Sequence, residues 1–313
     1  MLDKNIDLKV VGIGACVMDT LVTVPNFPKE DTKLRALSSK AAGGGPTATG
    51  LVAVAKLGVS AGFIGVLAKD TGGSFLLEDF NKYGVDTSQV EVKEGYRSFT
   101  STIWLAKDTA TRTCVFDKGD LPALALDESK RNAIAQAEIL MIDGNEMDAA
   151  QEGCKVAHGN GTKVLYDCGG LYQGVERLLK LTDVMIPSEE FALGHTGCDT
   201  VEEAAVKLYE MYQPEVVVIT CGKEGGIICK VKEDELVVER YPAFLVDAVD
   251  SNGSGDVFHG AFAAAMVKGM NYKECCIFAS AVSAIKCTGV GARESVPDFE
   301  TVKQFLEDRG VIL

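Results

Sequence analysis

The chain has 313 residues, of which 47% are hydrophobic and 33 are glycine, a composition typical of an α/β globular protein with a large core. Its formal net charge of -14 argues against a nucleic-acid partner and against binding through a basic membrane patch. None of the ten cysteines forms a C-x-x-C pair, so the sequence predicts reduced, mostly buried thiols rather than disulfides or a metal site.

The N-terminal residues, from Met1 to Asp7, are too polar and acidic for a signal peptide. No uninterrupted apolar run approaches the length needed to span a membrane. We therefore expect a cytoplasmic protein with no membrane partner.

Short apolar runs alternate with helical patterns along most of the chain, which predicts βαβ units on a parallel sheet. Buried strands are expected at 10–13, 62–66, 139–142, 164–167, 184–186 and 216–220. Helices are expected at 47–57, 73–83, 129–137, 147–157, 201–211, 256–268 and 272–286. The predicted fold class is α/β, a three-layer arrangement with a doubly wound, mostly parallel sheet.

Two segments, 20–39 and 98–117, break this rhythm because they show loose alternation and turn signals, including a turn at 107–110. Both predict half-exposed antiparallel strands that form a small sheet at one edge of a pocket. We therefore expect an α/β domain built from 1–14, 40–96 and 119–313, with a β-sheet lid built from 15–39 and 97–118.

The most informative motif is D-S-N-G-S-G-D at 250–256, which ends a glycine-rich turn and leads directly into an apolar helix. Backbone N–H groups at such a helix start have no intrahelical partner and form a cradle for an anion. An acid inside this cradle, Asp256, suits a base that removes a proton from a hydroxyl while the N–H groups hold negative charge. An acid near a helix start is also common as a simple cap.

The pattern D-x-N-G-x-G-D followed by a helix resembles the second signature of the ribokinase family, the phosphofructokinase-B-type carbohydrate kinases. The resemblance implies a ribokinase-like fold and ATP-dependent phosphorylation of a sugar-like alcohol. It assigns Asp256 as the catalytic base. It places the anion hole on the backbone of four residues: Gly253, Ser254, Gly255 and Asp256.

The segment G-G-G-P-T-A-T at 43–49 resembles the first signature of the family, G-G-x-x-x-N. The resemblance implies that Gly44, Gly45 and Thr49 contact the sugar, with Thr49 standing where asparagine is usual. Asp19 is expected just after the first strand, at the end of a parallel strand where ligands of open α/β sheets bind. Its carboxylate can accept hydrogen bonds from two neighbouring sugar hydroxyls.

Two stretches of the presumed lid, F-P-K-E-D at 27–31 and T-R-T at 111–113, resemble the ketohexokinase branch of the family. This resemblance implies that Asp31 and Arg112 reach the sugar, and it makes a fructose-like substrate an option. The asparagine that is usual in that branch at the position of Pro46 is absent. Family members often pair their lids, so a homodimer is implied.

The strand at 216–220 leads into C-G-K-E-G-G, which resembles the T-x-G-x-x-G loop that lies along ATP in the family. Thr220, Gly222 and Gly225 are the matching residues. In members of the family, segments that resemble 281–292 of this chain flank the adenine of ATP. The predicted nucleotide site is completed by Ser283, Cys287, Gly253 and Gly255.

The segment P-S-E-E-F at 187–191 corresponds to the family's N-x-x-E motif, which organises Mg²⁺ through water. Glu189 or Glu190 is expected to supply the negative charge there. The resemblance also suggests a K⁺ ion, held by backbone carbonyls beside Asp250.

Two other functions stay open at this point. A nucleoside kinase of the same fold needs an aromatic residue to stack on the base, and Phe99, Trp104 and Phe116 of the lid are candidates. A catalytically silent sugar or nucleotide sensor needs neither the base nor the anion-hole glycines. The remaining polar candidate, His259, is expected to be a helix-surface or packing residue.

Overall fold

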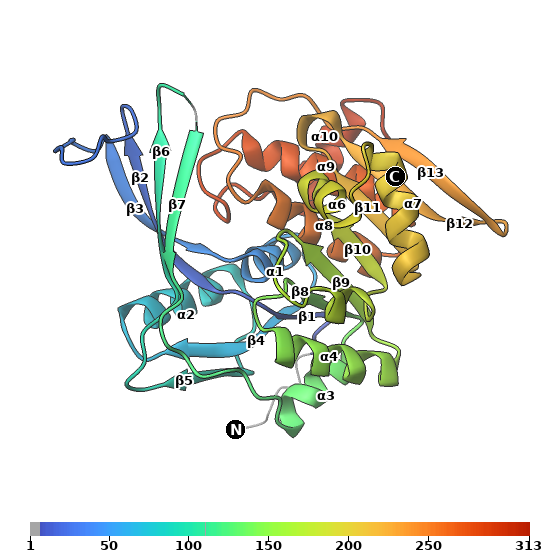
Figure 1. Ribbon diagram of the computed structural model, residues 1–313, viewed down its shortest axis with the longest axis horizontal. Coiled ribbons are helices and arrows are strands. Elements are labelled where there is room, and N and C mark those ends of the chain that lie inside the picture. The colour runs from blue at the N-terminus through green and yellow to red at the C-terminus, as the bar shows by residue number, and fades with distance from the viewer. Residues whose placement is uncertain (1–6, 110) are drawn as a thin grey trace.

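The centre of the molecule is a nine-stranded sheet with the order β13-β12-β11-β10-β9-β8-β1-β4-β5 (Figure 1). The structure is a computed structural model that describes residues 7–109 and 111–313. The polar N-terminal residues 1–6 and Ala110 of the predicted turn lie outside the described residues.

The strands from β5 to β11 in this order run parallel, which confirms the predicted mostly parallel sheet. Apart from the half-exposed edge strand β5, their apolar runs are buried on both faces, as expected for strands that helices cover on two sides. The strands are β1 (Val10–Ile13), β4 (Ala61–Ala68), β5 (Val90–Lys93), β8 (Ile139–Ile142), β9 (Lys163–Cys168), β10 (Val184–Pro187) and β11 (Val216–Thr220).

An antiparallel hairpin extends the sheet at one edge and was not among the predicted elements. It consists of β12 (Gly226–Lys232) and β13 (Glu235–Tyr241), with β12 paired to β11. The turn residues Glu233 and Asp234 both have positive φ, 52° and 67°, which matches the right-handed twist of a two-residue hairpin.

Helices cover both faces of the sheet and divide the core into two clusters, so the predicted three-layer architecture is confirmed. One face carries α1 (Pro46–Lys56), α2 (Thr71–Tyr83), α8 (Ser254–Val267), α9 (Tyr272–Cys287) and α10 (Phe299–Glu307). The other carries α3 (Glu128–Gln136), α4 (Met147–Asn160), α5 (Glu176–Leu179), α6 (Glu189–Thr196) and α7 (Val201–Tyr212). In the described ranges no helix combines the length and apolarity that crossing a membrane requires.

A separate four-stranded sheet, with the order β3-β2-β6-β7, projects from one side of the molecule (Figure 1). It contains β2 (Val17–Val24), β3 (Ser38–Gly44), β6 (Thr100–Ala106) and β7 (Thr111–Asp117). The expectation of purely antiparallel strands is wrong, because β2 and β6 pair in parallel. The alternating residues at 33–37 form an exposed loop, since strand β3 begins only at Ser38.

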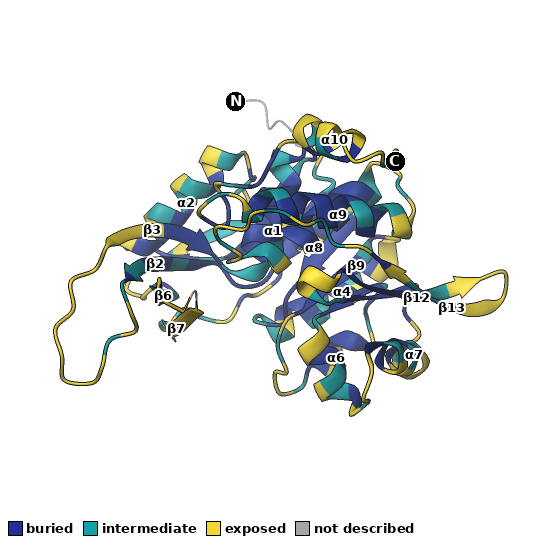
Figure 2. Cartoon of the chain, turned by 90° about the horizontal axis from the view of Figure 1, so that it is seen from above, coloured by how far each residue is buried: buried dark blue, intermediate teal, exposed yellow. Residues whose placement is uncertain are grey.

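Helices α1 and α8 are mostly buried (Figure 2). They approach each other at Gly50 and Gly260. A Cβ atom on Gly260 would lie 2.0 Å from the carbonyl oxygen of Gly50. The two backbones therefore touch directly, and this contact fixes the start of α8 relative to the start of α1.

We predict that Gly260→Ala lowers the free energy of unfolding by about 1–3 kcal/mol, because the new methyl group meets backbone rather than a movable side chain. Gly159→Ala is the matched control, since Gly159 is exposed in α4 and a Cβ there has no neighbour within 4 Å. This control should be stabilising by about 0.5–1 kcal/mol. Urea unfolding of both variants measures the difference, and equal effects would contradict the close helix crossing.

Candidate active site

The first turn of α8 presents unpaired backbone donors, as the 250–256 motif predicts. The helix begins at Ser254, two residues before its predicted start, and Gly253 precedes it with a φ of 71°. No side chain caps this helix, whereas Asp70, Thr200 and Asp298 accept N–H bonds at the starts of α2, α7 and α10. The N–H of Ser254 donates to the Ser251 carbonyl at 3.2 Å, and those of Gly255 and Asp256 are left for a ligand.

Asp256 lies in this first turn and is half-buried. Burial raises the pKa of its carboxyl, and the charge of His259 opposes the rise. A carboxylate with a raised pKa accepts a proton more readily near neutral pH than an exposed aspartate does. The position and environment of Asp256 both suit a general base.

His259 was expected to be a helix-surface or a packing residue. It is only 5% exposed, so the packing alternative describes it. Its Nδ1 lies 2.6 Å from the carbonyl oxygen of Gly255, and its Nε2 lies 2.9 Å from that of Ile186. The Asp167 carboxylate is 3.2 Å from Nδ1, and burial raises the pKa of that carboxyl to about 7. The imidazole therefore ties the glycine turn of the anion hole to strand β10.

Asp143 ties the segment after β1 to the first turn of α1 and was missed at the sequence level. It follows β8, and its Oδ2 accepts the N–H groups of Ala15 and Thr47 at 2.8 and 3.1 Å. Its Oδ1 accepts the N–H of Asn145 at 2.9 Å. The signal available in the sequence was an acid directly after a buried parallel strand.

Asp19 lies within lid strand β2 rather than at the end of the first sheet strand, so its predicted location was wrong. Its Oδ1 accepts a hydrogen bond of 2.6 Å from the Ser101 hydroxyl on β6. Burial raises the pKa of this carboxyl, and the Ser101 hydrogen bond opposes the rise. A Cβ on Gly44 would lie 2.0 Å from Oδ2, so only glycine allows this close approach.

The double-glycine loop is held from below by Arg293, a residue without a local sequence signal. This guanidinium is 1% exposed and donates to the Gly44 carbonyl at 2.7 Å and to Asp79 at 2.6 Å. It also donates to the Thr49 hydroxyl at 3.3 Å. Thr49 is fully buried beside Arg293, so the expected direct contact between Thr49 and the substrate is not supported. Gly45 directly precedes α1, at the N-cap position, with a φ of 95°.

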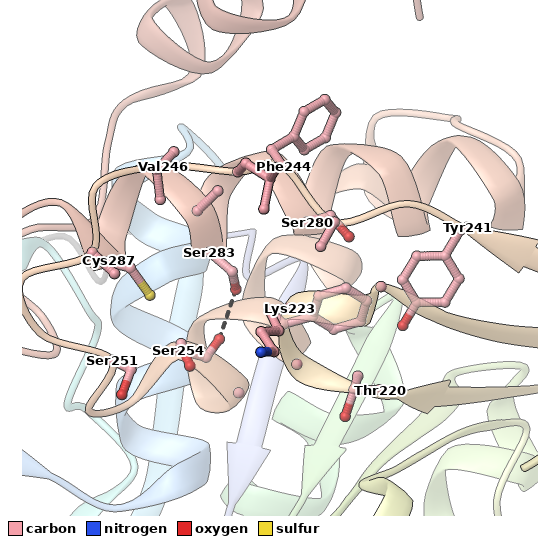
Figure 3. Close-up of a pocket in the computed structure, with 18 of the residues that line it drawn as sticks. Thr220, Lys223, Tyr241, Phe244, Val246, Ser251, Ser254, Ser280, Ser283 and Cys287 are labelled. Atoms are coloured by element: carbon pink, nitrogen blue, oxygen red, sulfur yellow. Dashed lines mark hydrogen bonds between the residues drawn. The ribbon is translucent and has the colours of Figure 1, made fainter. Parts of the chain in front are cut away.

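A cavity of about 460 Å³ adjoins the start of α8 and brings the predicted nucleotide residues together (Figure 3). Phe244 and Tyr241 supply aromatic walls, and the Ser283 hydroxyl donates to the Ser254 carbonyl at 2.7 Å. The predicted residues on its lining are Thr220, Gly222, Gly225, Gly255, Ser283 and Cys287. Gly253 is not part of this lining and lies behind the turn, against Ala292.

A second cavity of about 790 Å³ lies between the lid and the 250–252 turn. Arg112 and Lys107 of the lid line it, and the charge of Arg112 acts to lower the pKa of Asp256. The two cavities share Ala248 and Ser251. Asp31 sits in the exposed lid loop and lines neither cavity, so the structure does not bring it to the site.

The model of the pfkB family of carbohydrate kinases matches residues 7–298 of this chain. The chain belongs to this family. The ribokinase of Haemophilus influenzae is 26% identical over 302 residues, covering 94% of this chain and 97% of the relative. The 5-dehydro-2-deoxygluconokinase of Clostridium perfringens is 25% identical, covering 97% and 94%. The structure of Arabidopsis thaliana ribokinase complexed with ribose and ATP shares the fold, with a TM-score of 0.84 and 24% identity over 96% and 99% of the chains.

The two glutamates predicted to organise Mg²⁺ in this pfkB-family chain lie on the surface and do not form a cluster of direct metal ligands with other described residues. Glu189 and Glu190 are exposed at the start of α6, where Ser188 caps the Phe191 N–H at 3.1 Å. Burial raises the pKa of Cys221, directly after β11, to about 11, and the charge of Glu189 adds to the rise. Within 7–109 and 111–313, no three His, Cys, Asp or Glu side chains form a metal-binding group.

The predicted potassium position beside Asp250 is held by protein groups. Both Asp250 carboxylate oxygens accept backbone N–H groups at 2.9 Å, from Asn252 and from Gly291. The carbonyl oxygens of Asp250 and Asn252 accept hydrogen bonds from the Lys286 ammonium. These donors do not fit a potassium ion at those carbonyls.

We predict that Arg293→Met destabilises the protein by about 3 kcal/mol or more and weakens sugar binding, because it leaves Asp79 unpaired and frees the Gly44 carbonyl. Arg177→Met is the matched control, since its ion pair with Asp148 is exposed and should change stability by less than about 1 kcal/mol. Urea unfolding and the KM for the sugar report the two effects. Similar stability of both variants would show that Arg293 does not support the loop.

Proposed function

We propose that this chain transfers the γ-phosphoryl group of ATP to a hydroxyl group of a sugar. The observation that carries the proposal is the position of Asp256, in an uncapped helix start beside a nucleotide-sized cavity. The Arabidopsis relative, which shares the fold, was crystallised with ribose and ATP. The names of the two relatives include different sugars, so the sugar itself is left to experiment.

In the proposed reaction, the oxygen of the sugar hydroxyl forms a bond to the γ-phosphorus, and Asp256 accepts the proton that this hydroxyl loses. The bond between the γ-phosphorus and the bridging oxygen breaks, and ADP leaves. The backbone N–H groups of Gly253, Gly255 and Asp256 hold the charge on the transferring group, whereas the N–H of Ser254, also predicted for this role, donates to the Ser251 carbonyl. Phosphoryl transfer depends mainly on such positioning and electrostatic stabilisation.

We assign the sugar to the space between Asp19, Gly44 and Gly45, with Arg112 of the lid closing it. Asp19 is buried yet keeps Oδ2 free of the Ser101 hydrogen bond, so this oxygen can accept from a sugar hydroxyl. Asp31 stays a prediction, because its loop must move to bring it near.

We assign the ATP phosphates to the loop of Thr220, Gly222 and Gly225, and the adenine to the walls near Ser283 and Cys287. The glycine at 225 has a φ of 83°, and a Cβ there would lie 2.1 Å from the Tyr241 carbonyl, so the loop needs glycine at this position. Lys223 lines the same cavity and adds a positive charge.

Magnesium, when bound, neutralises part of the phosphate charge. We propose that it is held by the ATP phosphates and by water contacts to Glu189 or Glu190, because the described residues offer no direct ligand set. A cytoplasmic location, in which ATP and Mg²⁺ are abundant, remains a prediction.

We further propose that residues 15–39 and 97–118 act as a lid and that two copies of the chain pair through it. Strand β7 is exposed along its full length and lies at the edge of the small sheet. Val115 and Phe116 on this strand are 57% and 61% exposed. An exposed apolar edge strand is a ready template for pairing with another chain.

The main test incubates ketoses, aldoses and nucleosides with ATP and Mg²⁺ and measures ADP release. We expect acceptor-dependent release with at least one sugar, and a loss of about 100-fold or more in rate for Asp256→Asn, with ATP binding retained by calorimetry. Asp148→Asn, at an exposed position on α4, is the control and should keep full activity. Near-normal turnover of Asp256→Asn would contradict the assignment of Asp256 as the base. Turnover of nucleosides alone would show that the substrate is a nucleoside and not a sugar.

The lid proposal predicts that the wild type sediments as a dimer and that Val115→Lys sediments as a monomer, because a charge in the centre of a paired edge opposes association. Val231→Lys, on the distant hairpin and 47% exposed, is the matched control and should stay dimeric. A monomeric wild type in sedimentation velocity runs would refute pairing through β7.

A further inference from the structure

Lys286 is a buried cation beside the anion hole that the proposed reaction does not use. It lies in the last turn of α9, and its side chain is fully buried. Its Nζ donates to the main-chain carbonyl of Asp250 at 2.7 Å and to that of Asn252. Buried lysines are rare unless they serve a specific partner, and here the partners are two carbonyls of one turn.

These two carbonyls belong to the peptide units that build the phosphate-binding turn. The C=O and N–H of a trans peptide unit point in opposite directions. The ammonium that holds the Asn252 carbonyl therefore turns the N–H of Gly253 to the other side of the turn. The Asp250 carbonyl fixes the N–H of Ser251 in the same way, and Ser251 lines both cavities.

The groups that stabilise the charge of Lys286 are its two carbonyl partners and a nearby carboxylate. Burial lowers the pKa of Lys286, and the nearby Asp250 carboxylate opposes this change. Two carbonyl oxygens that converge on one point form a ligand set that also suits a monovalent metal ion such as K⁺. A side-chain ammonium and K⁺ can thus perform the same task, and only one of them fits at a time.

We propose that Lys286 is a built-in monovalent cation that positions the anion-hole turn, so that this kinase works without a bound alkali-metal ion. Lys286 is a positioning residue, since it acts through the backbone of the turn. The expected effect on kcat rests on the proposed phosphoryl transfer. The expected binding of K⁺ to a variant without Lys286 does not.

Other contacts keep the turn folded when the ammonium is removed. The Cys287 carbonyl accepts the N–H groups of Val249 and Asp250 at 2.7 and 3.1 Å. Ser283 donates to the Ser254 carbonyl at 2.7 Å. Lys286→Met, which conserves length and volume, should therefore fold and leave two carbonyls beside a small space without a cation.

The experiment compares the wild type with Lys286→Met in choline chloride, with KCl, NH₄Cl or LiCl replacing choline at constant ionic strength. We expect the wild-type rate to change by less than about twofold among the salts. Lys286→Met should lose about 10-fold or more in kcat in choline, because one anion-hole donor is no longer held, and should regain activity in K⁺ or NH₄⁺ but not in Li⁺.

Lys207→Met is the matched control, because Lys207 also donates to a main-chain carbonyl, that of Thr196, at 2.6 Å, but lines neither cavity. It should show no salt-specific activity. A wild type that requires K⁺ overturns the proposal, and so does a folded Lys286→Met that is fully active in choline or that no cation rescues.

A second readout needs no turnover. K⁺ should raise the thermal midpoint of Lys286→Met by at least about 2 °C relative to choline and leave that of the wild type unchanged, because only the variant has a vacant carbonyl pair. If no acceptor is ever phosphorylated, the kinase assignment fails while this measurement still decides the role of Lys286. Lys286→Gln repeats the measurement if Lys286→Met does not fold, and the absence of a K⁺-specific shift in a folded variant overturns the proposal.

Discussion

The direct backbone contact between Gly50 of α1 and Gly260 of α8 is the constraint on which the site depends. Each helix starts in a glycine loop, and both loops carry the groups assigned to the reaction. Because the helices touch without side chains between them, the distance from the proposed sugar loop to the proposed anion hole is set by main-chain atoms. Arg293 adds a second constraint on the glycine loop before α1, because its guanidinium donates a hydrogen bond to the Gly44 carbonyl.

The net charge of -14 makes the local electrostatics of the site informative. An anionic nucleotide must approach a negative protein, and the positive potential that receives it comes from uncapped N–H groups and from the buried ammonium of Lys286. His259 and Lys286 both contact main-chain carbonyls of the anion-hole turn or of β10. Burial raises the pKa of Asp256, which makes its carboxylate a better proton acceptor than an exposed aspartate.

Much of the fold was predictable because its signals are local. Six buried strands and the long helices follow from apolar runs and periodicity, and the motif at 250–256 lies where a glycine turn meets a helix. Asp19 was misplaced because β2 follows β1 after only three residues, and an alternating strand so close to a buried strand reads as a loop. The parallel pairing of β2 with β6 joins segments about eighty residues apart and has no local signature.

The residues that the sequence did not reveal act across long separations. Arg293 bonds to Gly44, and Lys286 bonds to Asp250, and each pair is joined only by folding. Asp143 had a readable position after a strand, but its partners at Ala15 and Thr47 did not. Motifs that contact a ligand through one loop are therefore readable, whereas the supports beneath them are not.

The shared wall of the two cavities has a consequence for chemical probes of this protein. Ala248 and Ser251 border both spaces, so one short segment forms a boundary of the nucleotide side and of the lid side. A label attached at position 251 therefore reports on both cavities at once.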